Sequence, residues 1–151
     1  MAESVSFAQR GILIILWGSI TLIMNKVFMQ TPTEFIQEWL TKVSSNDAEV
    51  IVSLYKEEAV LLGTMDAAVR KGKNNIREYF DYFVTLRPRG KITYIIYEEV
   101  SDGAVAISNG TYIFELYEGD KLATVSARFT FVLEKAGTKW EILSHHSSKI
   151  P

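Results

Sequence analysis

The chain has no cysteine, only two histidines and only three prolines among its 151 residues. The absence of cysteine excludes disulfides, thiolate nucleophiles and zinc–thiolate sites. Metal-ligand spacings, catalytic-triad orders and glycine-rich phosphate loops are also missing, so we expect no metal and no cofactor. Basic residues are not in excess either. With a net charge of −2 and a pI of about 5.7, we expect no nucleic-acid partner.

One long uncharged run is present, from Gly11 to Met24. As a helix it would be about 21 Å long, and about 28 Å if it continued to residue 29, against a hydrocarbon core of about 30 Å. We therefore predict an apolar N-terminal helix that acts as a signal or membrane anchor through residues 11–29, which favours an anchored or exported protein over a cytoplasmic one. Three alternatives remain open. The segment could be a helix packed on the domain or a partner, or an unusual tail of a cytosolic protein; or the start codon could be assigned too far upstream, with Met24 the true first residue.

Residues 1–30 thus form an N-terminal segment, and residues 31–151 suit a single domain. This domain begins at Thr31, which is followed by Pro32 and by Glu34 at capping-box spacing. Apolar residues at helical spacing predict a helix from there to about residue 43. The pattern then predicts a short helix over 48–55, a strand over 59–64 and a third helix that opens near residue 74.

The remainder has the alternation and turn residues of β-structure. Tight turns around Gly103, Gly119 and Gly137 join consecutive strands and therefore predict an antiparallel meander. Gly110 interrupts one strand and predicts a bulge or sharp bend. The fold class is thus α+β, with three helices that cover a curved antiparallel sheet around a cone-shaped hollow. The predicted strands are 91–100, 104–117, 121–134 and 139–148.

Five short segments, which follow one another in the same order as in that group of proteins, resemble the nuclear transport factor 2-like, SnoaL-like superfamily. Within it, the chain is most similar to small stand-alone proteins related to the association domain of calcium/calmodulin-dependent protein kinase II. The resemblance spans about residues 31–151. Since the superfamily includes isomerases, cyclases, dehydratases, epoxide hydrolases and non-catalytic hubs, it implies a fold but not a reaction. The segments are 58–64, 76–80, 110–114, 127–131 and 140–148.

Arg128 is the only cation in the middle of its predicted strand, on the polar face of that strand. Alternation alone predicts a solvated or subunit-facing arginine. The resemblance implies instead a buried pocket in which this arginine meets a carboxylate ligand. A guanidinium suits that role because it offers parallel donors and stays charged when it is desolvated.

The two histidines, His145 and His146, are adjacent in the last strand, so their side chains point to opposite faces and cannot hold one metal ion. Related proteins often carry a third histidine, where this chain has Ser144. His146, in phase with Trp140 and Ile142, corresponds to the histidine that faces the pocket in association domains. The alternative is a histidine that is hydrogen-bonded at a subunit contact.

The expected function is therefore a homo-oligomeric ligand-binding or assembly domain, with a dimer as the expected state. Its pocket would be formed by Arg128, His146 and Tyr112 and would take a small, carboxylate-bearing molecule. The alternative is an isomerase, cyclase or dehydratase of the ketosteroid-isomerase-like kind, with His146 as the candidate general acid or base. No acid–tyrosine pair stands out in the sequence, which favours the binding function.

Overall fold

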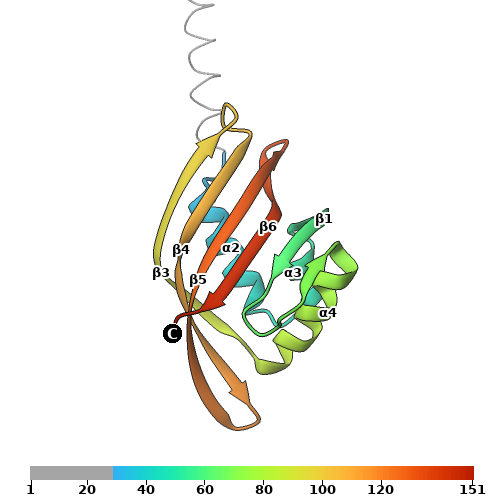
Figure 1. Cartoon of the computed structure of the whole chain (residues 1–151), viewed down its shortest axis with the longest axis vertical. Helices are drawn as coiled ribbons and strands as arrows, with labels where there is room; N and C mark the ends of the chain where they lie inside the picture. Colours follow the sequence, from blue (N-terminus) through green and yellow to red (C-terminus); the bar gives the residue numbers. More distant parts are fainter. Residues whose placement is uncertain (1–28) are drawn as a thin grey trace, which may run out of the picture.

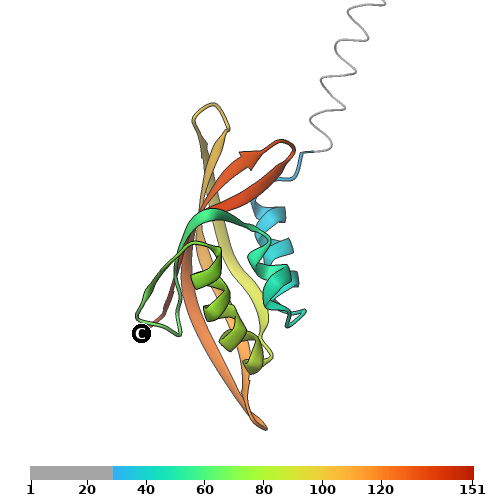
Figure 2. The ribbon, with the colours of Figure 1, turned by 90° about the vertical axis from the view of Figure 1, so that its right-hand side faces the viewer.

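Three helices cover one face of a six-stranded sheet and leave the other face uncovered (Figures 1 and 2). The computed structural model describes residues 29–151, so the predicted signal or anchor helix lies outside the described residues. Within residues 29–151, no helix is long and apolar enough to cross a bilayer. We name the helix-covered face of the sheet the inner face and the opposite face the outer face.

The helices are α2 (Pro32–Val43), α3 (Ala48–Val52) and α4 (Lys73–Phe83), and a short 3-10 turn, η1 (Val84–Leu86), follows α4. The predicted start of α2 is confirmed, because Thr31 and Glu34 form a reciprocal capping box. Asp47 caps α3 with its carboxylate. This helix ends earlier than predicted, since Tyr55 already belongs to the first strand.

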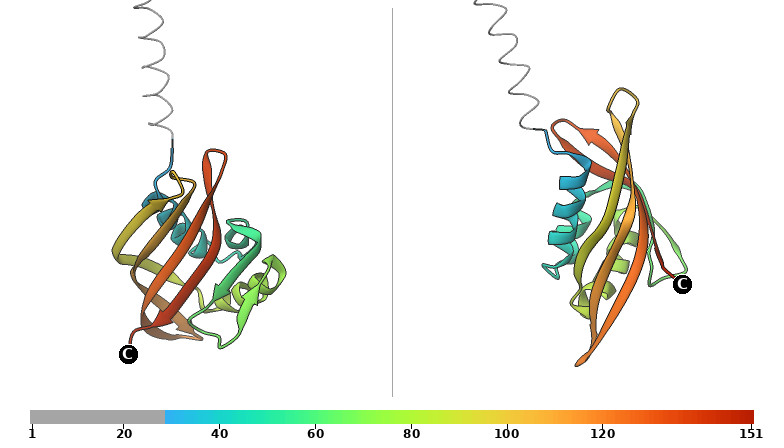
Figure 3. Two further views of the ribbon diagram at one scale, coloured as in Figure 1. Left: turned by 45° about the horizontal axis from the view of Figure 1, so that its top comes forward. Right: turned by 90° about the vertical axis from the view of Figure 1, so that its left-hand side faces the viewer.

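The sheet has the strand order β2-β1-β6-β5-β4-β3. Strands β3 to β6 form the predicted antiparallel meander. The prediction of a wholly antiparallel sheet was wrong in one respect, because β1 pairs in parallel with β6. The sheet is curved but open, and its edge strands β2 and β3 do not pair (Figure 3). The strands are β1 (Tyr55–Leu62), β2 (Val69–Lys71), β3 (Arg89–Val100), β4 (Val105–Glu118), β5 (Lys121–Ala136) and β6 (Lys139–Lys149).

The irregularity predicted at Gly110 lies in the neighbouring strand. The register between β3 and β4 skips Thr93, while Gly110 itself stays paired with Ile95. A Cβ atom at Gly110 would collide with the carbonyl oxygen of Tyr94 and with the ring of Phe129. Glycine is therefore required at this position by the close approach of the neighbouring strand and ring.

Aromatic side chains fill most of the space between the helices and the inner face. Trp39 of α2 lies at the centre, with the ring centroids of Phe131 at 5.2 Å, Tyr112 at 6.2 Å and Phe80 at 6.5 Å. Trp39 itself is only 2% exposed. The predicted cone-shaped hollow is thus largely a packed aromatic core.

The capping box gives a direct test of how α2 begins. We expect Thr31→Ala to lower the free energy of unfolding by about 1 kcal/mol, because the backbone N–H of Glu34 loses its side-chain acceptor. Thr33→Ala is the matched control, with an expected change within about 0.5 kcal/mol. Urea unfolding measures both. Equal losses in the two variants would contradict the role assigned to Thr31.

Candidate functional site

A bulge at Leu143 decides which histidine faces the core. Ile142 pairs with Leu133 and Ser144 with Val132, so Leu143 is an extra residue in β6. The alternation therefore changes phase, and His145 rather than His146 points to the inner face. The predicted inward phase of His146 was wrong for this reason. His145 is 2% exposed, whereas His146 is exposed on the outer face.

A hydrogen-bonded chain of three side chains holds His145 in the core. The indole Nε1 of Trp39 donates to the hydroxyl of Tyr55 over 3.2 Å, and this hydroxyl lies 2.9 Å from Nδ1 of His145. The imidazole also stacks on Phe131, with 3.9 Å between ring centroids. Its second nitrogen, Nε2, is buried and has no partner among the described residues.

Burial fixes the charge state of this group. It lowers the pKa of His145 to about 3, and the neighbouring His146 adds to this shift. Burial likewise raises the pKa of the Tyr55 hydroxyl well above its usual value. Near neutral pH both groups are therefore uncharged, and they act as hydrogen-bonding groups rather than as a proton-transfer pair.

A second polar cluster lies beside His145 on the inner face. Tyr112 donates its hydroxyl to Ser147 Oγ over 2.5 Å, and Ser147 is hydrogen-bonded to the hydroxyl of Thr64. Together with aromatic and aliphatic side chains, these residues line an interior cavity with a free volume of about 20 Å³, room for roughly one water molecule. The lining consists of Trp39, Leu61, Gly63, Thr64, Met65, Tyr79, Phe80, Phe83, Tyr112, Phe114, Leu116, Val125, Ala127, His145 and Ser147.

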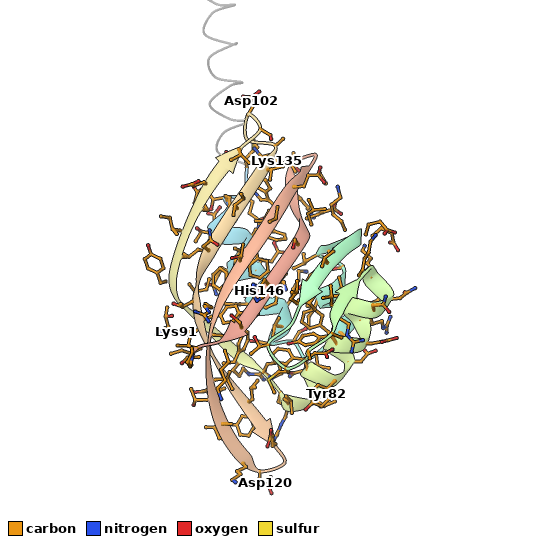
Figure 4. The ribbon with its side chains drawn as sticks, viewed as in Figure 1. Tyr82, Lys91, Asp102, Asp120, Lys135 and His146 are labelled. Atoms are coloured by element: carbon orange, nitrogen blue, oxygen red, sulfur yellow. The ribbon has the colours of Figure 1, made fainter. Side chains whose placement is uncertain are left out.

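Arg128 and His146 share a different site, a hollow of about 280 Å³ on the outer face. Arg128 Nε donates to Ser148 Oγ over 3.1 Å, and no carboxylate of the described residues forms an ion pair with this arginine. His146 projects from the middle of the sheet (Figure 4). The other residues that line the hollow are Asn109, Gly110, Phe129, Thr130 and Ser148.

The structure therefore brings two of the three predicted ligand residues together and separates the third. Arg128 and His146 line the hollow on the outer face, and Tyr112 lies on the inner face, where it is 2% exposed. Sequence reasoning missed His145 as a site residue, because nothing in the strand's residue types marks the change of phase at Leu143. Residues 29–151 contain no group of three or more metal-ligating side chains.

The curved sheet and the three helices that cover it have the fold of the nuclear transport factor 2-like proteins. The sequence profile of the calcium/calmodulin dependent protein kinase II association domain matches residues 30–151, and the chain belongs to this family. The comparison with curated proteins found no match for the chain.

Solved structures agree with this assignment. One from Xanthomonas campestris, described as a calcium/calmodulin dependent protein kinase II association domain, is 35% identical, with a TM-score of 0.73 over 77% of this chain and 83% of that one. Two Novosphingobium aromaticivorans proteins share the fold alone. One, described as a scytalone dehydratase, is 10% identical and has a TM-score of 0.70. The match covers 79% of this chain and 81% of that one. The other, a nuclear transport factor 2-like protein, is 13% identical and has a TM-score of 0.66. The match covers 89% of this chain and 88% of that one.

The neutral state of His145 predicts a dependence of stability on pH. A histidine in the unfolded chain titrates near 6.5, whereas folded His145 stays neutral down to about pH 3, so the unfolded state binds more protons between these values. This group therefore costs stability as the pH falls below 6.5, by up to about 1.4 kcal/mol per pH unit, and has no effect above it.

Urea unfolding between pH 6.5 and pH 5 tests this, because carboxyl groups titrate mostly below that range. We expect the wild type to lose stability there more steeply than His145→Gln. If the unfolding free energies of the two proteins depend equally on pH, the low pKa of folded His145 is contradicted. If the variant does not fold, NMR titration of the wild-type His145 ring gives the same information, and protonation of the ring above pH 5 would be the contradicting result.

Proposed function

We propose that the domain forms a homodimer and binds a small carboxylate at Arg128 on its outer face. The observation that carries this proposal is an arginine with no acidic partner in the described chain, beside a hollow of about 280 Å³. The fold alone would not assign a ligand, because this superfamily includes both enzymes and binding proteins.

The chemistry of the hollow suits a carboxylate. Only Nε of Arg128 is used by Ser148, so the terminal N–H groups remain available for the two oxygens of the ligand. His146 and Thr130 line the same hollow and supply further polar contacts. An exposed ion pair of this kind contributes at most about 1 kcal/mol in water. Tight binding therefore requires the site to be covered, and a second subunit would provide that cover.

The outer face also supports association with a second copy of the chain. Tyr94 is 60% exposed, Ile96 52% and Ile113 36%, on strands that no helix of the described chain covers on this side. Apolar side chains gathered on an uncovered sheet face are typical of interaction surfaces. The occupant we propose is the same face of another subunit, in keeping with a family whose domains are named for association.

Substitution of Ile96 tests the dimer. We expect the full-length wild type to sediment as a dimer and Ile96→Lys as a monomer, because a charge at this position would be buried without a partner. Tyr82→Lys is the matched control, since Tyr82 is also exposed, at 53%, but lies on α4. A monomeric wild type, or dissociation by Tyr82→Lys alone, would contradict this interface.

Ligand-induced thermal stabilisation tests the carboxylate site. We expect benzoate to raise the Tm of the wild type and uncharged benzamide to have little effect. Arg128→Ala should weaken benzoate binding about tenfold or more, and Arg128→Lys should restore only part of it, because lysine lacks the planar fork. Arg87→Ala, at an arginine that stacks on Tyr117, is the control and should behave as wild type. If benzoate raises the Tm of Arg128→Ala by as much as that of the wild type, the proposal that Arg128 binds the carboxylate is wrong.

The enzyme alternative has less support. Its support is one structural neighbour, 10% identical, that is described as a scytalone dehydratase. Yet no aspartate or glutamate of the described residues lines the interior cavity, and the candidate His146 lies on the outer face. General acid–base catalysis needs proton donors and acceptors grouped around one reacting centre. For this reason we propose binding rather than catalysis.

A further inference from the structure

The hollow around Arg128 lies inside the apolar part of the outer face rather than beside it. Residues that pair directly across neighbouring strands point to the same face of a sheet. One row of such residues crosses the sheet from β3 to β1 through the hollow. Its three polar members lie between exposed apolar side chains, since Ile96 at one end is 52% exposed and Leu62 at the other end 38%. The row consists of Ile96, Asn109, Thr130, His146 and Leu62.

Arg128 lies in the next row, which also contains an exposed apolar side chain. Arg128 is paired with Thr111 of β4 and with Ser148 of β6. Thr111 is paired in turn with Tyr94 of β3, which is 60% exposed. Because β5 lies between β3 and β1 in the sheet, a second copy of the chain that covers both Tyr94 and Leu62 also covers Arg128.

Covering Arg128 takes a cation out of water without giving it a partner. Neither row contains an aspartate or a glutamate, and Arg128 has no ion pair among the described residues. A buried charge without a partner is strongly destabilising. A carboxylate in the hollow would neutralise the guanidinium and accept its free N–H groups. The interface between two copies is therefore electrostatically complete only when this anion is bound.

We infer that a small carboxylate controls the assembly of the domain, because the dimer binds it more tightly than the monomer does. This inference rests on the proposed function, in which Arg128 holds the carboxylate and the outer face forms the dimer. Coupling of this kind is reciprocal, so the carboxylate also strengthens the association of the two subunits. The fraction of dimer then follows the concentration of the acid.

The size of the effect on association follows from the number of sites. The coupling between two binding events is typically about fivefold or more. An isologous dimer has two copies of the Arg128 site, so saturation with ligand changes the dissociation constant of the dimer by the square of the factor for one site, about 25-fold.

Analytical ultracentrifugation of the full-length protein over a dilution series tests this coupling. We expect saturating benzoate to lower the dissociation constant of the dimer about 25-fold, and uncharged benzamide to leave it unchanged. Benzoate should also bind more tightly at protein concentrations above this dissociation constant than below it. If benzoate dissociates the dimer instead, a carboxylate of the second copy already pairs with Arg128, and the inference is wrong.

Arg128→Gln tests the electrostatic cause, because it removes the charge and keeps a polar side chain. Without ligand, we expect the dimer of this variant to be about tenfold tighter than that of the wild type, since no unpaired charge is buried. Benzoate should leave it unchanged. Arg87→Gln is the matched control: it removes an arginine that stacks on Tyr117 outside these two rows, and its dimer should respond to benzoate as the wild type does.

The possible negative results have different meanings. A wild type that stays monomeric at every concentration, with and without benzoate, would refute the dimer, and the absence of benzoate binding would refute the carboxylate site; either result would also overturn the inference. A dimer whose dissociation constant is the same with and without bound benzoate would overturn the inference alone. So would an Arg128→Gln variant that dimerises no better than the ligand-free wild type.

Discussion

The buried chain from Trp39 through Tyr55 to His145 constrains the whole domain, because it joins α2, β1 and β6 at the centre of the core. Three polar side chains in an aromatic interior are tolerated only when they are paired with one another. The pairing requires β6 to carry its bulge at Leu143, since regular alternation would turn His145 outward. The register of β6, the position of α2 and the hydrogen bonds of the buried polar side chains therefore depend on one another.

The same bulge divides the chemistry of the sheet between its two faces. His145 and His146 are neighbours in sequence, yet one is a neutral group in an aromatic core and the other lies beside a cation at the surface. The hollow on the outer face therefore carries the charge of Arg128, whereas the inner face around His145 carries no charged side chain.

Most of the fold could be predicted from the sequence, because local signals mark its elements. The capping box at Thr31 and the glycine turns at 103, 119 and 137 lie where the pattern indicates. The parallel pairing of β1 with β6 could not be predicted in this way, since it joins segments far apart in the chain. The site was predicted only in part for a related reason: a bulge at Leu143 has no marker residue, and one unmarked residue exchanges the two faces of a strand.

The central position of β6 has a consequence for how the domain folds. In the order β2-β1-β6-β5-β4-β3, this strand joins a hairpin formed early in the chain to a meander formed late. Each part can collapse by local contacts, but the sheet becomes continuous only when β6, the last strand of the meander, pairs with β1. Non-local parallel pairing of this kind slows folding. Until it is complete, β1 and β6 both present unpaired edges, so this step is the one most exposed to misassociation between chains.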